Sequence, residues 1–210
     1  MKAFPFTYCD FFDLYANTYL IVDEKDDAVL IDPGKEDSKL VEFIKDGGIN
    51  LKAILLTHGH FDHIRGVDGL VKEFDISVYI HEKDVELLSN PHLNCSDRFS
   101  RNNIKVSSKA IPVKDGQILS LLSEDILVLN TPYHTEGSCC FYLEDSGILF
   151  SGDSLFKGNI GRSDFPTSDS GKIEASLNKI LSLSEETKIY PGHNEETTLK
   201  EERIVNQFVK

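Results

Sequence analysis

The chain has 210 residues, of which 40% are hydrophobic, and a formal net charge of −13. A chain of this length and composition can bury one sizeable core, and its unbroken spread of strand and helix patterns predicts a single domain over residues 1–210. The acidic excess argues against a nucleic-acid partner, because binding to a polyanion relies on lysine and arginine contacts to phosphates.

The sequence carries no signal for membrane insertion or export. No apolar run reaches the length of a membrane span, and the aromatic start of the chain is broken by Asp10 and Asp13, unlike a signal peptide. The four cysteines show no spacing typical of a disulfide framework. We therefore expect a cytoplasmic protein without a membrane partner.

The first part of the chain predicts a hairpin, a helix and a buried strand. Strand-like runs at 18–22 and 28–31 flank a polar turn, which is typical of a β-hairpin. Apolar residues at helical spacing follow at 40–44, and two glycines close this helix. The continuous apolar run 53–56 predicts a parallel strand that is covered on both faces.

Residues 57–63, directly after this strand, contain three imidazoles and one carboxylate, in the order His58, His60, Asp62 and His63. Imidazole nitrogens and carboxylate oxygens hold zinc, iron or manganese, and packing them together without a metal would leave costly unpaired polar groups. A fortuitous surface cluster is the alternative, but the spacing is specific and more ligand-type residues follow downstream. The segment therefore predicts a metal site, in which Gly59 lets the loop turn tightly.

Three further ligand-type residues each follow a separate strand-like run. They are His134, Asp153 and His193, after the runs that end at residues 129, 150 and 190. Ligand sites in open α/β sheets lie at the carboxyl ends of strands, so we expect these side chains to join the histidine loop at one edge. Five histidines and two aspartates suffice for two ions, and a carboxylate has two oxygens with which it can span both ions, whereas an imidazole cannot. Asp32, after the second strand, is expected to accept a hydrogen bond from the histidine loop.

The middle of the chain alternates helix, strand and an irregular segment. A helix is predicted over 64–74 and a strand over 78–80, followed by a polar helical stretch. His81 and His92 are predicted to lie on the surface. Segment 90–109, rich in Asn, Ser and Arg, is predicted to be irregular and to form part of the pocket wall.

A second sheet is predicted from short strands separated by polar turns. These strands lie at residues 118–122, 126–129, 140–143 and 148–150. Cys139 and Cys140 are adjacent in this pattern, so their side chains should pack on opposite faces rather than bind a metal.

Two helices are predicted in the last part of the chain. The apolar stripe 173–181 predicts a helix that faces the core, with its N-cap within 168–170, and segment 195–209 predicts a second amphipathic helix. Periodicity alone therefore indicates a mixed α/β domain.

Together these motifs resemble the metallo-β-lactamase superfamily, and within it the glyoxalase II-like branch. The resemblance covers nearly the whole chain and includes segments 31–34, 152–156, 161–166 and 190–193. It implies an αββα sandwich that holds two divalent metal ions, with zinc as the first candidate beside iron and manganese. The residues matching the ligands of one ion are His58, His60 and His134. Those matching the ligands of the other ion are Asp62, His63 and His193, with Asp153 bridging the two.

Such a site favours hydrolysis of a small-molecule substrate. Metal coordination lowers the pKa of water from about 15.7 to about 7, which supplies hydroxide at neutral pH. Asp62 and Asp153 would be the catalytic carboxylates of the ligand set. The resemblance implies a thioester such as S-lactoylglutathione, whose thiolate leaves readily because the pKa of a thiol is about 8.5.

Three residues are candidates for contact with this substrate. Arg162 occupies a position similar to the basic residue that contacts glutathione in the family, and Lys157 is a second cation for its carboxylates. An equally open interpretation is that Arg162 pairs with Asp164. Tyr133 stands where relatives usually carry glycine, and it could cover the substrate or pack beside its neighbour Pro132.

One departure from hydroxyacylglutathione hydrolases lies at the end of the chain. Only residues 194–210 follow the last ligand, so we expect no C-terminal helical domain of the kind that helps to bind glutathione in those enzymes.

Other functions share this scaffold. In mononuclear-iron glutathione persulfide dioxygenases, the main alternative, the equivalents of His58, His134 and Asp153 hold the iron. Hydrolysis is favoured over that reaction by the residues that follow the His134 and His193 motifs. A nuclease or lactonase of the superfamily is less favoured, the nuclease because of the negative charge. A non-catalytic binding module would lack one or more ligands, and none is missing here.

Overall fold

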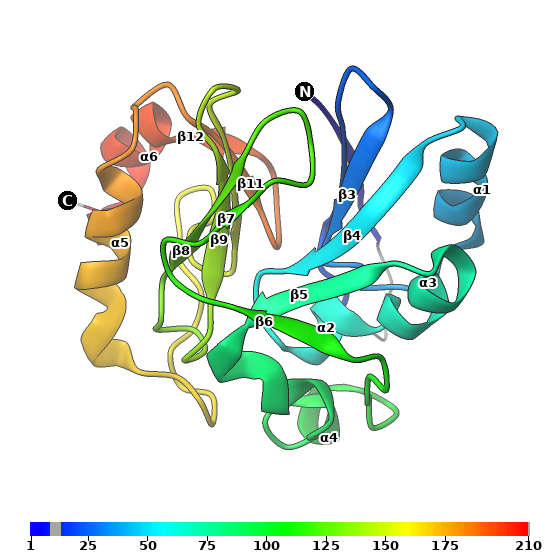
Figure 1. Cartoon of the computed structure of the whole chain (residues 1–210). Coiled ribbons are helices and arrows are strands. Elements are labelled where there is room, and N and C mark those ends of the chain that lie inside the picture. The colour runs from blue at the N-terminus through cyan, green and yellow to red at the C-terminus, as the bar shows by residue number, and fades with distance from the viewer. Residues whose placement is uncertain (9–13, 210) are drawn as a thin grey trace.

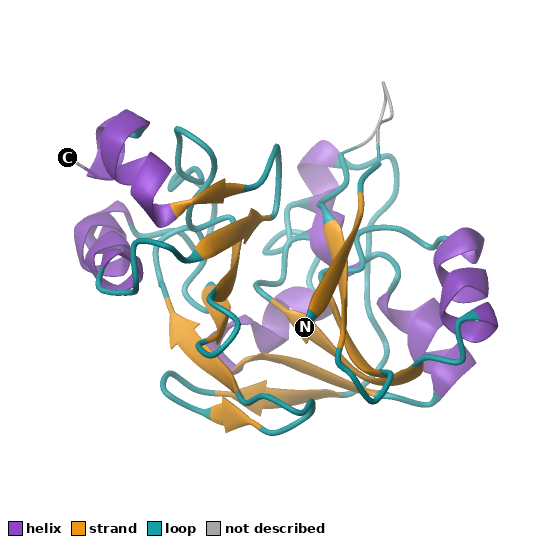
Figure 2. Ribbon diagram, turned by 90° about the horizontal axis from the view of Figure 1, so that it is seen from above, coloured by secondary structure: helices purple, strands orange, loops and turns teal. Residues whose placement is uncertain are grey.

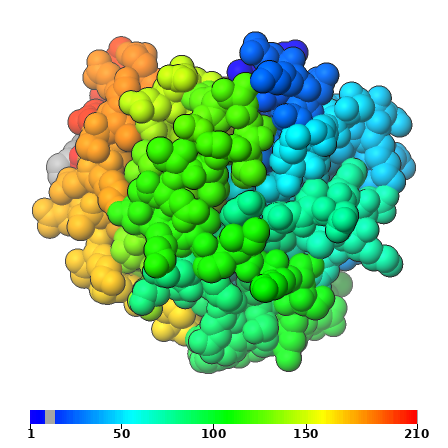
Figure 3. All heavy atoms as spheres, viewed as in Figure 1, coloured from blue at the N-terminus to red at the C-terminus, as the bar shows by residue number. Residues whose placement is uncertain are grey.

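The structure, a computed structural model, describes residues 1–8 and 14–209. The strands in these residues form two six-stranded sheets that lie face to face, with helices on the outer face of each (Figure 1, Figure 2). This arrangement confirms the predicted αββα sandwich of the α/β class. In the space-filling view the orange and red C-terminal part lies on the left and the blue N-terminal part at the top, and the green middle of the chain covers much of the visible face (Figure 3).

The first sheet contains the histidine loop and begins with the predicted hairpin. Its strands, in spatial order, are β1 (Lys2–Phe6), β2 (Thr18–Val22), β3 (Asp27–Ile31), β4 (Asn50–Leu56), β5 (Ser77–His81) and β6 (Ala110–Val113). The strands from β3 to β6 are parallel, and β2 runs antiparallel between β3 and β1. Strand β4 is the buried parallel strand that the apolar run predicted.

The second sheet supplies the other ligands. Its strands, in spatial order, are β12 (Thr197–Thr198), β11 (Lys188–Pro191), β10 (Ile148–Gly152), β9 (Cys139–Leu143), β8 (Ile126–Asn130) and β7 (Ile118–Leu119). β10 pairs parallel with β11, and β9 runs antiparallel between β10 and β8. Strands β8, β10 and β11 therefore point the same way, and their carboxyl ends lie at one edge of the sheet.

The helices cover the outer faces of both sheets. The α-helices are α1 (Ser38–Asp46), α2 (Phe61–Ile64), α3 (Val67–Phe74), α4 (Ser96–Phe99), α5 (Ile173–Leu181) and α6 (Leu199–Val205). Three 3₁₀ helices join them within the described residues, η1 (Glu82–Leu88), η2 (Ser170–Lys172) and η3 (Gln207–Val209). Apolar residues of α1 and α3 pack on the first sheet, and those of α5 and α6 pack on the second.

An apolar layer fills the space between the two sheets. Leu55 of β4 and Phe150 of β10 are fully buried in it, and each large side chain of this kind contributes about 1.5–3 kcal/mol by burial. Cys139 belongs to this layer, whereas Cys140 packs under α5 and α6, which confirms that they face opposite sides. This layer holds together the two strand edges that carry the ligands.

The predicted helix over 64–74 is divided, with α3 forming its main part. The Gly66 amide donates to the carbonyl of Pro33 at 2.8 Å instead of extending α2. The Asp62 carbonyl, which Gly66 would bond in a continuous helix, accepts from the Ala16 amide at 3.1 Å. Two bonds to the N-terminal part of the chain therefore end α2 and anchor the segment that carries Asp62.

The predicted C-terminal helix over 195–209 begins later than expected. Strand β12 pairs with β11 first, because this pairing satisfies backbone groups of an otherwise open edge strand. Helix α6 then starts with Thr198 as its N-cap, whose hydroxyl accepts a hydrogen bond from the Glu201 amide.

The prediction that His81 lies on the surface is wrong. His81 is buried at the end of β5, and its side chain accepts a hydrogen bond from the Lys83 amide that begins η1. His92 is exposed, as predicted. No helix within residues 1–8 and 14–209 is long and apolar enough to cross a membrane.

Candidate metal centre

The histidine loop leaves β4 at Thr57, which is held by Asp32 from the end of β3. The Asp32 carboxylate accepts hydrogen bonds from the Thr57 amide at 2.8 Å and from its hydroxyl at 2.6 Å. The same carboxylate lies 2.9 Å from His63 Nδ1. This confirms that Asp32 orients the loop, and it turns the Nε2 atom of His63 toward the other ligands.

The first ligand group consists of three imidazoles. His58 Nε2 lies 3.1 Å from His60 Nδ1, which lies 2.9 Å from His134 Nε2. His134 Nδ1 donates to the backbone carbonyl of Arg162 at 2.7 Å, so its Nε2 presents a lone pair to the group. Nitrogens about 2.0–2.1 Å from a tetrahedral zinc ion are about 3.3 Å apart, so this spacing fits a divalent cation.

The second ligand group combines a carboxylate with two imidazoles. His193 Nε2 lies 3.2 Å from Asp62 Oδ2, and His63 Nε2 lies 3.9 Å from the same oxygen. The ligand atoms of this group lie within 4.8 Å of one another. A mixed nitrogen and oxygen set of this kind suits zinc, iron and manganese.

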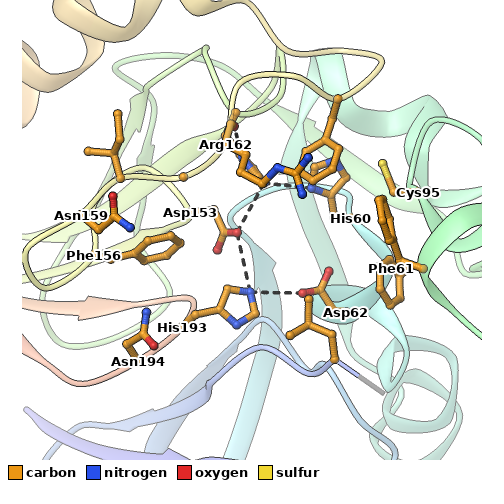
Figure 4. A pocket seen from close by; sticks show the side chains of 16 residues that line it. His60, Phe61, Asp62, Cys95, Asp153, Phe156, Asn159, Arg162, His193 and Asn194 are labelled. Atoms are coloured by element: carbon orange, nitrogen blue, oxygen red, sulfur yellow. Dashed lines mark hydrogen bonds and ion pairs between the residues drawn. The ribbon is translucent and has the colours of Figure 1, made fainter. Parts of the chain in front are cut away.

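Asp153 lies between the two groups. Its Oδ2 atom is 3.4 Å from His134 Nε2 and 3.6 Å from His193 Nε2, while its Oδ1 atom is 3.4 Å from His63 Nε2. Figure 4 shows that Asp153 and Asp62 both lie next to the same ring nitrogen of His193. The carboxylate therefore faces both groups, as the bridging role requires.

Two residues of the cluster already have the protonation state that a metal ligand needs. Burial and the neighbouring His134 lower the pKa of His60 to about 3, so its imidazole is neutral. Burial raises the pKa of Asp153, but His193 and His63 outweigh it and hold this pKa well below its usual range. Metal ligands must be deprotonated, and these two residues are in that form at neutral pH.

Burial and open space in the cluster also fit metal ions. Among the described residues, His63 Nε2 and Asp153 Oδ1 are buried without a hydrogen-bond partner. Unpaired buried polar atoms are costly, and a cation would satisfy both. Gly192 keeps the space free, because a Cβ atom there would collide with Asp153 Oδ1 and lie 2.8 Å from His63 Cε1. The donor set and its surroundings therefore fit a pair of divalent ions.

Five of the seven candidate ligands line a cavity of about 490 Å³, namely His60, Asp62, His134, Asp153 and His193. Cys95 and Phe99 form part of its wall, as predicted for segment 90–109, although the segment is not wholly irregular because it contains α4. Phe156 lies on the opposite side of Asp153 in the view of Figure 4. A cavity of this size suits a small-molecule substrate.

Arg162 lines the cavity, but its guanidinium is already paired. Nε and Nη2 donate to the two Asp164 carboxylate oxygens at 2.9 and 2.7 Å, and the guanidinium lies 4.7 Å from the centroid of the Phe165 ring. Arg162 therefore pairs with Asp164 within its loop and also lies on the cavity wall, so this structure contains a feature of each alternative.

A family model described as the metallo-beta-lactamase superfamily matches residues 12–193, which include every ligand of both groups. The chain belongs to the metallo-beta-lactamase superfamily. Some members that resemble this chain along nearly its whole length are named as hydrolases. Probable metallo-hydrolase YqgX of Bacillus subtilis is 35% identical over 93% of this chain and 93% of its own. Hydroxyacylglutathione hydrolase GloC of Haemophilus influenzae is 33% identical over 92% of each chain.

Solved structures of the superfamily extend the comparison. The crystal structure of BLEG-1 B3 metallo-beta-lactamase has a TM-score of 0.88 and 37% identity, covering 92% of this chain and 94% of that one. The structure of TTHA1623 in a di-iron-bound form has a TM-score of 0.87 and 38% identity, covering 98% and 99%. This chain is accordingly a metallo-hydrolase of the superfamily with a metal-binding site of histidines and aspartates.

Two of the residues predicted to contact substrate do not line the cavity. Tyr133 is fully buried, accepts a hydrogen bond from the Gly161 amide and donates to the Ser154 carbonyl, so it supports the cavity wall from behind. The prediction that it touches substrate is therefore wrong. Lys157 is not among the lining residues, and its ammonium donates to Glu195 at 3.0 Å outside the cavity.

Asp84 is a residue of the site that the sequence did not reveal. Its buried carboxylate accepts hydrogen bonds from the Gly59 amide at 3.0 Å, the Thr135 hydroxyl at 2.7 Å and the Gly137 amide at 2.7 Å. It thereby joins the histidine loop to the loop that carries His134. No local pattern marked it, because the segment that forms η1 reads as an ordinary polar helix.

Gly59 has a different role from the one predicted. Its φ angle is not positive, so the tight turn does not require glycine. A Cβ atom there would lie 2.5 Å from Leu87 Cβ in η1. Close packing of the loop against η1 therefore selects glycine, and it also brings the Gly59 amide to Asp84.

Proposed function

We propose that this metallo-hydrolase holds two divalent metal ions and hydrolyses thioesters, with S-lactoylglutathione as the reference substrate. The main support for this proposal is that Asp153 faces two complete groups of candidate ligands beside an open cavity. One ion would be held by the first group of three imidazoles, and the other by Asp62, His63 and His193. When bound, such a pair of ions supplies hydroxide at neutral pH and polarises a carbonyl.

The residues of the chain prepare this site for hydrolysis. Asp32 holds the ring of His63, and the Arg162 carbonyl holds the ring of His134, so the ligand atoms stay directed at the space beside Asp153. Water adds its oxygen to the thioester carbonyl carbon, the carbon–sulfur bond breaks, and the products are a carboxylic acid and a thiol. A thiolate needs little help from a general acid, because the pKa of a thiol is about 8.5.

A second ligand group argues for hydrolysis over dioxygenation. A mononuclear iron centre on His58, His134 and Asp153 would leave Asp62 and His193 without a function, although they lie 3.2 Å apart beside Asp153. We therefore propose the two-ion hydrolase and keep the persulfide dioxygenase as the competing outcome of the test.

The test combines metal analysis with activity assays on the purified full chain. We expect two equivalents of zinc, iron or manganese per chain and cleavage of S-lactoylglutathione or another thioester, measured as released thiol. A single iron per chain with oxygen uptake on glutathione persulfide would overturn the proposal. Cleavage of a β-lactam without any thioester cleavage would overturn it as well.

A further inference from the structure

The metal ligands are flanked by aromatic rings. The Phe165 ring lies 5.1 Å from the ring of His60 and 5.6 Å from that of His134, centroid to centroid. On the side of the second ligand group, the Phe156 ring lies 5.9 Å from that of His193. Any group attached to a carbonyl carbon beside Asp153 therefore meets an apolar ring on either side.

This apolar character continues from the ligands to the mouth of the cavity. Its large apolar lining residues are Leu14, Phe61, Phe99, Phe156, Ile160 and Phe165. Leu14 and Phe99 remain 51% and 49% exposed, so apolar surface reaches the solvent at the rim. Exposed apolar surface that is continuous with a cavity is typical of a binding site for an apolar group.

Positive charge for an anionic carrier is scarce on this wall. Within residues 1–8 and 14–209, Arg162 is the one lysine or arginine that lines the cavity, and Asp164 already holds it through two hydrogen bonds. Glutathione carries two carboxylates, which would have to compete with Asp164 for this single guanidinium. The net charge of −13 adds a repulsive field for any anionic substrate.

We propose that the cavity selects thioesters with an apolar acyl group on an uncharged thiol carrier. The inference rests on the proposed thioester hydrolysis and names its substrate class. The carbonyl carbon must lie beside Asp153, so an acyl chain that extends from it meets Phe165 on one side or Phe156 on the other. Each buried methylene then adds binding free energy in the transition state, and the paired Arg162 is not needed for a carboxylate.

The test compares acyl chains on one neutral carrier. Acetyl, butanoyl and hexanoyl thioesters of N-acetylcysteamine are assayed with the metal-loaded enzyme beside S-lactoylglutathione. We expect kcat/KM to rise about fourfold for each added methylene up to the capacity of the cavity. We also expect the hexanoyl thioester to exceed S-lactoylglutathione by at least about tenfold in kcat/KM, since two methylenes alone supply about sixteenfold.

A pair of variants ties the preference to the cavity wall. Phe99→Ala should lower the ratio of hexanoyl to acetyl kcat/KM by about tenfold, because it removes apolar surface at the rim. Phe43→Ala is the matched control, since Phe43 is 41% exposed on α1 and does not line the cavity. It should leave the ratio unchanged.

The outcomes separate this inference from the proposed function. Equal kcat/KM values along the acyl series, or a preference for S-lactoylglutathione, would overturn the apolar selection while thioester hydrolysis stands. If no thioester is cleaved by metal-loaded enzyme, the proposed function itself is wrong. An unchanged ratio in Phe99→Ala would show that the selectivity does not come from this wall.

Discussion

Asp153 has its two carboxylate oxygens turned toward different ligand groups, with Oδ1 3.4 Å from His63 Nε2 and Oδ2 3.4 Å from His134 Nε2. No imidazole could replace it, because one ring nitrogen at a time faces a metal. The backbone at Gly192 and Gly161 approaches Asp153 so closely that neither position has room for a side chain. At this scale the site depends on single atoms rather than on the class of residue.

Replacing Asp153 by Ala should abolish hydrolysis and metal loading together. We expect at least a thousandfold loss in kcat and fewer than two bound ions per chain, because the oxygen that faces each group is removed. Metal analysis of the dialysed variant, with circular dichroism as the check on folding, measures this. Retention of two tightly bound ions would reject the bridging role.

Gly192→Ala should impair the metal centre without unfolding the chain. The added methyl group collides with Asp153 Oδ1 and crowds the His63 ring, so we expect metal affinity to fall by at least about tenfold. Gly69→Ala is the control. Gly69 lies in α3, and a Cβ atom there would lie 3.4 Å from Glu36 Oε1, which is an ordinary contact distance. That control should bind metal normally and be slightly stabilised, by up to about 1 kcal/mol. Normal metal binding by Gly192→Ala would contradict the close approach.

At the scale of elements, the site is assembled by loops that start at strand ends and are tied to one another. Asp32 at the end of β3 holds the loop after β4, and Asp84 of η1 holds that loop to the one after β8. The ends of β10 and β11 are joined by the Gly192 amide, which donates to the Gly152 carbonyl at 2.8 Å. Buried carboxylates between loops therefore do the positioning that no single strand could do.

The pH dependence of stability should reveal Asp84. Burial raises its pKa from 3.8 in the unfolded chain to about 6 in the folded one, so its contribution to stability is fully present below about pH 4 and is lost as pH rises through about 6. We expect wild type to lose about 3 kcal/mol of unfolding free energy relative to Asp84→Asn across this window. Urea unfolding of metal-free protein between pH 4 and 7 tests this. A difference between the two proteins that does not vary with pH would contradict it.

At the scale of the whole molecule, the two sheets and their shared core bring the ligand-bearing edges together. The first group takes His134 from the second sheet and two imidazoles from the first, and the second group takes His193 in the same way. A metal ion bound in either group would therefore link the two halves of the sandwich. Any separation of the sheets would break both groups at once.

Removing the metal ions should lower the thermal stability of the whole chain. A ligand present at about a thousand times its dissociation constant stabilises the folded state by about 4 kcal/mol, which corresponds to roughly 8–16 °C in a chain of this size. Scanning calorimetry with added zinc and with a chelator measures the shift. Asp153→Ala should show a much smaller shift, and equal melting temperatures of wild type with and without metal would refute the linkage between sheets.

The sequence by itself determined the mixed α/β class and marked the candidate ligand residues. His58, His60 and Asp62 could be predicted because their spacing follows a buried strand, and Asp153 because it follows another such run. Alternation and helical periodicity likewise predicted the main strands and helices. These features depend on the spacing of residues close together in the chain, and that spacing can be read from the sequence.

Only the tertiary structure decided which residues meet one another across the fold. Tyr133 is buried behind the cavity, Arg162 is paired with Asp164, and Asp84 joins two loops that are 78 positions apart at Gly59 and Gly137. Such contacts depend on how the sheets and loops approach in space, since each of these side chains has several partners of suitable chemistry. Local pattern cannot choose among those partners, and the packing of the sandwich does.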